Sequence, residues 1–274
     1  DPAKVSGVFM EQMKWCSLMG VDNVADLNEM ITNGKFGDLV RINEALHEKK
    51  VAEIADKIHQ KKDKIKVVLI AGPSSSGKTT FANRLCVQLR VLGISPHAIS
   101  LDNYFINRED VPLDEFGNKD FEDINTLDIK QLNEDMTKMI AGETVELPYY
   151  NFVTGKREYN GEYATLEEEG IFVIEGIHGL NDLLTASIPE ENKFKIFISA
   201  MTQLNIDDHN RISTSDSRLI RRIVRDNQFR GRDAATTISS WDYVARGEER
   251  NIFPFQENAD VIFNSATIYE LSAL

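Results

Sequence analysis

The sequence has little cysteine and shows no bias toward the residues of fibrous or disordered chains. Its 274 residues include only two cysteines, Cys16 and Cys86, without the spacing of metal ligands. We therefore exclude a miniprotein held by disulfide bonds and expect both thiols to be reduced. Hydrophobic residues make up 42% and charged residues 27% of the chain, the ordinary usage of globular proteins, which excludes a collagen-like or disordered chain.

Long apolar runs and a surplus of positive charge are also missing. No run approaches the roughly 18 apolar residues of a membrane span, and no signal peptide opens the chain, so we expect a cytoplasmic protein without membrane contact. The 31 Lys and Arg residues face 44 Asp and Glu residues, for a net charge of −13. This charge repels polyanions and counts against a nucleic acid as partner. The sequence leaves open whether the chain forms a homo-oligomer.

The hydrophobic pattern divides the chain near residue 62. Residues 1–62 have apolar side chains at helical spacing, most regularly from Leu39 to Ile58, and are predicted to be a helical N-terminal segment. We interpret it as an appendage packed on the main domain, with a partner-docking surface as the alternative. Because the chain begins with Asp1 and not with Met, we expect this segment to be the end of a longer upstream region.

Residues 63–274 alternate short apolar runs with helical stretches. The runs lie at 65–70, 171–174, 194–198 and 260–263, and the helical stretches at 78–92, 128–141 and 216–226. This alternation predicts an α/β domain with a parallel sheet covered by helices on both faces. Two segments rich in Asp, Asn, Gly and Tyr, at 103–126 and 142–165, are expected to be long functional loops.

One motif in this domain has a specific chemical meaning. The segment 72–79 fits G-x-x-x-x-G-K-[ST], directly after the first predicted strand and at the start of a helix. In such a P-loop, backbone N–H groups surround a phosphate group, Lys78 reaches the β- and γ-phosphates, and the Thr79 hydroxyl binds Mg²⁺. We therefore predict a P-loop NTPase-type domain that binds ATP and Mg²⁺. The nucleotide-binding residues are Gly72, Pro73, Ser74, Ser75, Ser76, Gly77, Lys78, Thr79 and Thr80.

Positive charge is gathered in the segment 211–233. It contains seven arginines, four of which share one face of a predicted helix opposite an aliphatic face. Two roles compete for them: pairing with the surplus acids or with solvent, and a lid that closes guanidinium groups over transferring phosphates. Beside a P-loop we favour the lid. The four arginines are Arg218, Arg221, Arg222 and Arg225.

Two acidic residues end predicted strands, where ligands bind in α/β domains. Asp102 follows the apolar segment 98–101 and is predicted to accept a proton from a substrate hydroxyl, with a turn or cap aspartate as the alternative. Glu175 closes the strand at 171–174 and is predicted to hold Mg²⁺ through water. The aromatic residues of 148–152 are either a stacking surface for substrate or loop anchors.

Together these segments resemble the uridine kinase/phosphoribulokinase family, in particular its bacterial uridine kinase-like branch, over residues 65–265. The resemblance implies ATP-dependent phosphorylation of a primary hydroxyl group, which is the 5′-hydroxyl for uridine or cytidine. Longer members of that branch resemble threonyl-tRNA synthetase in an N-terminal region, which agrees with a helical segment before the kinase domain. The matching segments, in the family's order, are 71–81, 100–105, 148–152, 175–177, 218–222 and 230–233.

The resemblance also implies roles for individual residues. Asp102 would be the general base, and Thr79 and Glu175 would order Mg²⁺. The transferring phosphoryl group would be stabilised by Lys78, Arg218 and Arg221. The acceptor pocket would be formed by Tyr104, Phe121, Glu122, Tyr150, Phe152 and Arg157.

Three positions on the acceptor side depart from the family pattern. Glu122 and Asn151 stand where uridine kinases have aspartate, and Gly155 stands where a histidine reads the pyrimidine edge. A lost hydrogen-bonding partner changes discrimination by orders of magnitude. We therefore favour a pyrimidine nucleoside as acceptor and keep two alternatives, a kinase of another sugar-like or vitamin-like alcohol and an ATP-binding regulatory module with weak hydrolysis. Asp102 and the arginines favour an enzyme, because a sensor needs no general base.

Overall fold

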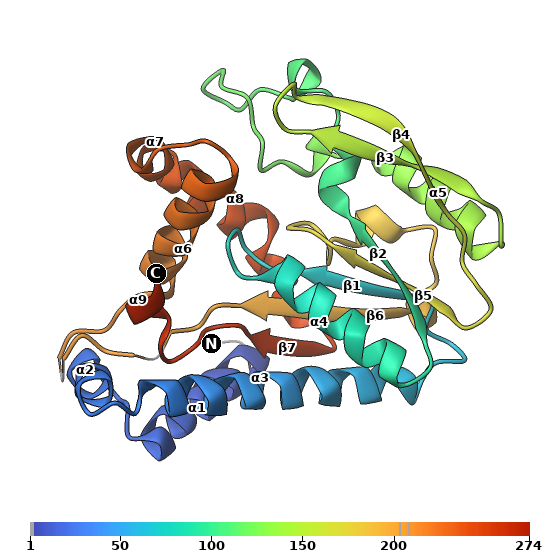
Figure 1. Cartoon of the computed structure of the whole chain (residues 1–274). Coiled ribbons are helices and arrows are strands. Elements are labelled where there is room, and N and C mark those ends of the chain that lie inside the picture. Colours follow the sequence, from blue (N-terminus) through green and yellow to red (C-terminus); the bar gives the residue numbers. More distant parts are fainter. Residues whose placement is uncertain (1–2, 203, 208) are drawn as a thin grey trace.

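The short apolar runs of the sequence form one parallel sheet in the computed structural model, which describes residues 3–202, 204–207 and 209–274. Its strand order is β2-β5-β1-β6-β7 (Figure 1), and each neighbouring pair is parallel. This confirms the predicted α/β class and the four predicted strands. The strands are β1 (Val67–Ala71), β2 (Ser95–Ser100), β5 (Gly170–Glu175), β6 (Lys193–Ser199) and β7 (Val261–Asn264).

Both faces of this sheet are buried. Successive side chains of a strand point to opposite faces. In β1, Val67 and Leu69 therefore enter one apolar cluster, while Val68 and Ile70 enter another on the opposite face. Burial on two sides explains why this strand is an unbroken apolar run.

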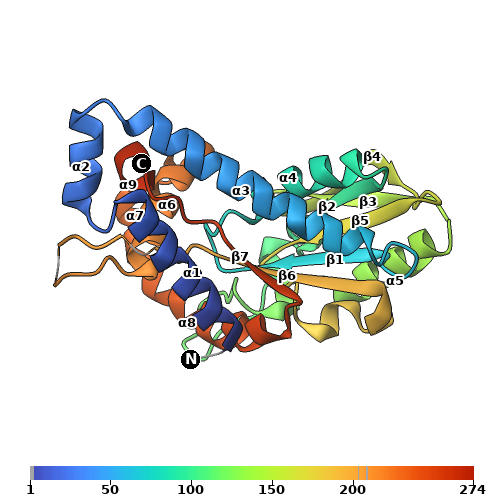
Figure 2. The same cartoon turned by 90° about the horizontal axis from the view of Figure 1, so that it is seen from below.

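The N-terminal segment covers one face of the sheet together with the P-loop helix. Figure 2 shows the long helix α3 (Phe36–His59) crossing this face with α4 (Lys78–Val91) beside it. The end of α3 belongs to the same apolar cluster as β1 and α4, so this cluster spans residue 62. Residues 1 and 2 of the predicted segment lie outside the described residues. The α3 side chains in this cluster are Val51, Ile54, Ala55 and Ile58.

The first two helices pack against β7 and α3. They are α1 (Ala3–Met19) and α2 (Val24–Thr32), and α2 begins with a capping box formed by Asn23 and Asp26. Their apolar side chains form a third cluster with Leu204 and residues near the C-terminus. Both cysteines are buried and free, one in α1 and one in α4. No helix in the described part of the chain is long and apolar enough to cross a membrane.

The opposite face carries α5 (Ile129–Ile140) and a separate hairpin (Figure 1). The hairpin consists of the antiparallel strands β3 (Val145–Asn151) and β4 (Lys156–Ala164). The prediction of a loop over 142–165 is therefore wrong. Most side chains of β4 are exposed, so this strand has a polar composition that resembles a loop.

The remaining helices follow β6 and stand at the carboxyl ends of the strands (Figure 1). They are α6 (Thr214–Phe229), α7 (Ala234–Ser239), α8 (Trp241–Asn251) and, after β7, α9 (Glu270–Ala273). The segment 103–126 is mostly irregular, as predicted for a long loop. Short 3-10 turns lie at Leu101–Tyr104, Arg108–Asp110, Ile124–Thr126, Asp182–Thr185, Glu190–Asn192 and Phe253–Asn258.

Candidate active site

The P-loop motif forms the turn between β1 and α4. Because β1 ends at Ala71 in the centre of the sheet, the loop lies at the carboxyl edge where α/β folds bind ligands. Gly72 is required by close packing, since a Cβ atom there would lie 2.3 Å from the carbonyl oxygen of Ile198. α4 begins at Lys78 and directs its free N–H groups and the positive end of its dipole toward the loop. This arrangement suits the binding of phosphate groups.

Lys78 lies across the P-loop close to two carboxylates. Its Nζ donates a hydrogen bond to the carbonyl oxygen of Pro73 at 3.1 Å. Burial lowers the pKa of Lys78, while the negative charges of Glu175 and Asp102 act in the opposite direction. The fold therefore brings together three of the predicted site residues, from the start of α4, the end of β5 and the turn after β2.

Thr79 and Glu175 place two oxygen ligands at the same edge. Glu175 Oε1 accepts hydrogen bonds from Thr79 Oγ1 at 3.1 Å and from Ser100 Oγ at 3.2 Å. Burial raises the pKa of Glu175, and the charge of Lys78 opposes this shift. A hydroxyl and a carboxylate fit Mg²⁺, which takes one or two protein oxygens together with water and phosphate oxygens. The described residues contain no cluster of three or more His, Cys, Asp or Glu side chains that would hold a metal without such help.

Asp102 lies in the helical turn Leu101–Tyr104 that follows β2. Burial raises the pKa of its carboxyl group, and the positive charges of Lys78 and Arg230 counteract this shift. A raised pKa brings a carboxylate closer to the range in which it takes up a proton near neutral pH. The position of Asp102 at a strand end beside the P-loop agrees with the sequence prediction, and its role as a general base stays a prediction.

The arginines of α6 face the P-loop. Arg218 Nε donates a hydrogen bond to the carbonyl oxygen of Ser74 at 3.1 Å, and Arg222 Nη1 donates to the hydroxyl of Ser74 at 2.8 Å. Arg221 Nη1 donates to the carbonyl oxygen of Ser75 at 3.4 Å. The shared arginine face predicted from helical spacing is therefore turned inward, and Arg218 and Arg222 are buried.

Arg218 and Arg221, the two arginines predicted to be catalytic, are each paired with an acidic side chain. Arg218 Nη2 lies 2.5 Å from Glu248 Oε2, and Arg221 Nη2 lies 2.5 Å from Glu270 Oε2. Of the two roles weighed for the arginine-rich segment, pairing with acids describes this structure. To stabilise a transferring phosphoryl group, a guanidinium group must exchange its carboxylate partner for phosphate, and that role stays a prediction.

Glu248 on α8 is a site residue that the sequence does not single out. Its Oε1 accepts a hydrogen bond from the backbone N–H of Ser74 at 2.9 Å, so a carboxylate binds one amide of the P-loop. Only 1% of Glu248 is exposed. The surplus of arginines in 211–233 is the one sequence signal that acidic partners are needed, and no local pattern indicates which acid supplies them.

Three of the residues predicted to form the acceptor pocket make contacts within the protein, and their role toward an acceptor stays a prediction. Tyr104 is fully buried, and its hydroxyl donates a hydrogen bond to Asp135 at 3.0 Å. Tyr150 is also buried. Arg157 Nη1 lies 2.9 Å from Asp128 Oδ2 and joins β4 to the start of α5.

The other three predicted pocket residues lie nearer to solvent or to the charged groups. Phe121 and Phe152 are 44% and 47% exposed and present ring surface on which a substrate can stack. The guanidinium carbon of Arg230 lies 5.4 Å from the ring centre of Phe152. Because Arg230 also acts on the pKa of Asp102, this ring belongs to the surroundings of the proposed base. Glu122 is buried, and burial raises its pKa to about 7.

Two departures from the family pattern have structural explanations in the β3–β4 turn. Asn151 Oδ1 accepts hydrogen bonds from the N–H groups of Val153 and Thr154 at 3.0 and 3.2 Å, a turn role that Asn and Asp share. Gly155 has a φ of +69°, and a Cβ atom there would lie 2.8 Å from Arg108 Nε. A histidine therefore does not fit at position 155 in this conformation, and Arg108 lies beside it.

Similarity to known proteins covers most of the chain. The model of the phosphoribulokinase/uridine kinase family matches residues 67–272. A uridine kinase of Proteus mirabilis is 30% identical over 213 residues, which cover 76% of this chain and 89% of that protein. A uridine kinase of Deinococcus deserti is 27% identical over 197 residues, 72% of this chain and 86% of that protein. A solved structure of a candidate fructose transport system kinase from Silicibacter sp. TM1040 shares the fold, with a TM-score of 0.50 and 14% identity over 78% of this chain and 98% of that one.

Proposed function

The chain belongs to the phosphoribulokinase/uridine kinase family, and we propose that it transfers the γ-phosphoryl group of ATP to the primary hydroxyl group of a small alcohol. The first candidate acceptor is a pyrimidine nucleoside, uridine or cytidine, phosphorylated at its 5′-hydroxyl. The observation that carries the proposal is the meeting of Lys78, Asp102 and Glu175 at the carboxyl ends of three neighbouring strands.

The P-loop holds the phosphate chain of ATP. Its backbone N–H groups and the ammonium group of Lys78 neutralise the β- and γ-phosphate oxygens. In doing so Lys78 exchanges its hydrogen bond to the carbonyl oxygen of Pro73 for phosphate oxygens. Because the loop is fixed between a central strand and α4, the phosphates are positioned before the reaction, which is the main contribution of the protein to phosphoryl transfer.

Asp102 accepts the proton of the acceptor hydroxyl group. As this proton leaves, the hydroxyl oxygen forms a bond to the γ-phosphorus, and the bond from that phosphorus to the β–γ bridging oxygen breaks, so that ADP departs. The raised pKa of Asp102, caused by burial, favours this proton uptake. The ammonium group of Lys78 offsets the negative charge on the oxygens of the transferring phosphoryl group.

Thr79 and Glu175 would hold Mg²⁺ beside the phosphates. When bound, the ion neutralises charge on the phosphate oxygens. The hydrogen bond from Ser100 Oγ to Glu175 Oε1 fixes the orientation of the carboxylate toward Thr79. This orienting bond comes from the last residue of β2, so the sheet itself positions the pair.

A second acceptor class, another sugar-like or vitamin-like alcohol, is favoured by the surroundings of Gly155. The family's base-reading histidine does not fit there, and Arg108 lies in contact with the glycine. Arg108 Nη2 donates one hydrogen bond to the carbonyl oxygen of Phe152 at 2.7 Å, and its guanidinium group has further donors to offer. Such donors suit an acceptor with exposed oxygen atoms, and position 155 does not carry a histidine that would select a pyrimidine.

The test is the release of ADP from Mg-ATP with a panel of acceptors, each compared with a blank without acceptor. The panel contains uridine, cytidine, pentoses and pantothenate. We expect stimulation by uridine or cytidine, and stimulation by a different alcohol alone would replace the acceptor while keeping the reaction. If ATP binds and no acceptor stimulates ADP release, phosphoryl transfer is contradicted and an ATP-binding regulatory module is favoured.

A further inference from the structure

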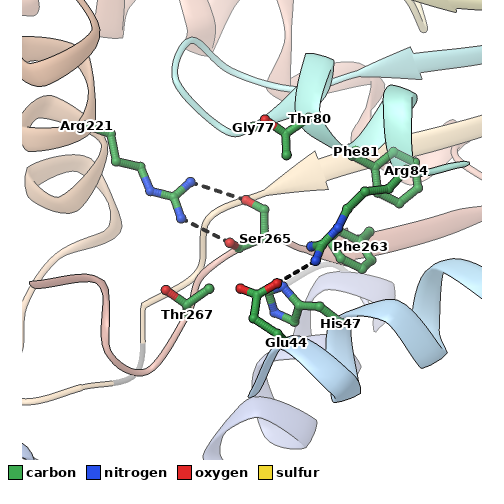
Figure 3. A pocket seen from close by; sticks show the side chains of 10 residues that line it. All are labelled: Glu44, His47, Gly77, Thr80, Phe81, Arg84, Arg221, Phe263, Ser265 and Thr267. Atoms are coloured by element: carbon green, nitrogen blue, oxygen red, sulfur yellow. Dashed lines mark hydrogen bonds and ion pairs between the residues drawn. The ribbon is translucent and has the colours of Figure 1, made fainter. Parts of the chain in front are cut away.

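A pocket of about 240 Å³ lies beside the P-loop, between the N-terminal segment and the end of the chain (Figure 3). Its walls come from four parts of the sequence that are far apart, one of which is α6 with Arg221. The P-loop side contributes Gly77 and Thr80, the segment after β7 contributes Ser265 and Thr267, and α3 contributes Glu44 and His47. The pocket is smaller than the roughly 300 Å³ at which sites for whole small molecules begin, so it suits one part of a larger ligand.

The sheet order places this pocket on the far side of the P-loop from the proposed reaction centre. β1 leads into the loop, and β5 and β2 lie on one side of it with Glu175 and Asp102 at or just after their ends. β6 and β7 lie on the other side, and Ser265 follows β7 directly. A nucleotide whose γ-phosphate is at Asp102 must extend its other end away from β5 and β2. That direction leads past Thr80 into the pocket.

The charges around the pocket suit an uncharged group better than a further phosphate. Two arginines line it, and each is already paired with an acid. Arg84 Nη2 lies 2.5 Å from Glu44 Oε2, and Arg221 Nη2 lies 2.5 Å from Glu270 Oε2 (Figure 3 shows the first pair). The ionised Glu44 adds repulsion toward any anion. A nucleoside, with hydroxyl and amino donors and no charge, matches such a lining.

Glu44 is held in place as a hydrogen-bond acceptor. Its Oε1 accepts from the Tyr269 hydroxyl at 2.6 Å, and its Oε2 accepts from Arg84 at 2.5 Å. Burial opposes ionisation, but these hydrogen bonds lower the pKa of Glu44, so the carboxylate is charged at neutral pH. A carboxylate has about four acceptor sites, so acceptor capacity remains for a ligand in the pocket.

α3 also fixes the segment that forms the opposite wall. Asn43 Oδ1 accepts a hydrogen bond from the backbone N–H of Ile268 at 3.0 Å, and His47 packs edge-on against Phe263 at 5.4 Å between ring centres. Burial lowers the pKa of His47 to about 4, so the ring is neutral at physiological pH. The Ser265 hydroxyl in this segment in turn donates to the carbonyl oxygen of Ser76 in the P-loop. The pocket is therefore a built part of the fold.

We propose that α3 completes the donor-nucleotide site and that Glu44 accepts a hydrogen bond from the nucleoside part of the nucleotide. The family match begins at residue 67, so Glu44 and His47 lie outside the region shared with the family, and they make the N-terminal segment part of nucleotide recognition in this chain. The inference rests on the proposed function for the identity of the nucleotide, but it concerns binding and needs no phosphoryl transfer.

The test compares the binding of ATP with that of inorganic tripolyphosphate, both in Mg²⁺, by isothermal titration calorimetry. The variant is Glu44→Gln, which keeps an oxygen for Tyr269. The matched control is Glu48→Gln, because Glu48 also lies on α3, also contacts Arg84, at 3.4 Å, and does not line the pocket. Thermal unfolding of all three proteins shows whether the folds are equally stable.

We expect Glu44→Gln to weaken ATP binding by about tenfold, the loss of one hydrogen bond to a charged group, while the affinity for tripolyphosphate changes less than about twofold. Glu48→Gln should leave both affinities unchanged. The inference is overturned if wild-type protein binds ATP no more tightly than tripolyphosphate, if Glu44→Gln leaves ATP binding unchanged, or if both ligands weaken equally. If the proteins show this binding pattern but the wild type phosphorylates no acceptor, the proposed function is contradicted and the inference still holds.

Discussion

Glu122 is a buried carboxyl group among the residues predicted to form the acceptor pocket, and its pKa is shifted by its surroundings. Only 9% of Glu122 is exposed. It packs closely on α8, because a Cβ atom added at Gly247 would lie 2.5 Å from the Cβ atom of Glu122. Burial raises the pKa of Glu122 to about 7, with Arg222 opposing the shift and Glu248 adding to it. A carboxyl group in this position changes charge near neutral pH.

The pKa of Glu122 has a consequence for stability. In the unfolded chain the group titrates near 4.5, and in the folded chain near 7, so its neutral form is favoured by folding. The stabilisation that neutral Glu122 gives to the folded state is fully present below about pH 4.5 and is lost as the pH rises through 7. We predict that Glu122→Gln and wild type have the same free energy of unfolding in urea at pH 4.5. Above pH 7 the free energy of unfolding of the variant should be higher by roughly 3 kcal/mol. A constant difference at all pH values would contradict the raised pKa.

Asn151 and Gly155 show what residue patterns can and cannot predict. The P-loop residues were predictable because eight consecutive positions carry the whole geometry of the loop. The meaning of Asn151 and Gly155 depends on a turn and on Arg108, which lies 47 residues before Gly155 in the sequence. Departures from a family pattern are visible in the sequence, and their cause is visible only in the fold.

At the scale of elements, Glu248 joins α8, α6 and the P-loop. Its carboxylate accepts a hydrogen bond from the Ser74 N–H and pairs with Arg218, and both side chains of the ion pair are almost fully buried. A carboxylate bound to the P-loop repels incoming phosphate, and it also keeps Arg218 from binding phosphate. We therefore expect nucleotide binding to compete with this three-part contact.

We predict that Glu248→Gln tightens the binding of ADP and weakens the fold. Removing the negative charge should raise the ADP affinity by about tenfold in calorimetry. Because Arg218 loses its charged partner in a buried site, the free energy of unfolding should fall by about 2 kcal/mol, less than for complete loss of a partner, since Gln still accepts hydrogen bonds. Glu249→Gln, an exposed neighbour on α8, is the control. Weaker ADP binding in a folded variant would show that Glu248 supports the phosphate site.

At the scale of elements, the spacing of apolar residues predicted the helices of the main domain. The helices at 78–92, 128–141 and 216–226 were predictable to within a few residues, because each has one face against the protein and a start or end signal. The hairpin at 145–164 was missed because β4 is mostly exposed and lacks an apolar face. Glu248 was missed because its partners lie up to 174 residues away in the sequence.

At the scale of the whole molecule, the N-terminal segment and the kinase region share one core. Ile58 near the end of α3 is fully buried in the cluster that contains β1 and α4. The family match begins after α3, at residue 67, although α3 covers the face of the matched sheet. The helical segment and its packing on the main domain were predicted, but the particular contact of the end of α3 with β1 was not, because the sequence carries no signal for contacts between distant segments.

We predict that Ile58→Ala destabilises the whole chain by about 2–5 kcal/mol in one cooperative transition, because it opens a cavity in the shared core. Ile42→Ala on the same helix, where the side chain is 44% exposed, should change stability by less than about 0.5 kcal/mol. Urea unfolding followed by circular dichroism and by tryptophan fluorescence measures both. Two separate transitions, with only one affected, would mean that the N-terminal segment is an independent unit.

Asp102→Asn tests the proposed reaction most directly, because Asn keeps the size of Asp and cannot accept the proton of the acceptor hydroxyl. ATP affinity and acceptor-stimulated ADP release are measured side by side, with the acceptor that stimulates the wild type. We predict that the ATP affinity stays within about twofold while the stimulated rate falls by at least about 100-fold. A variant that binds ATP and turns over at nearly the wild-type rate would contradict Asp102 as the base that enables phosphoryl transfer.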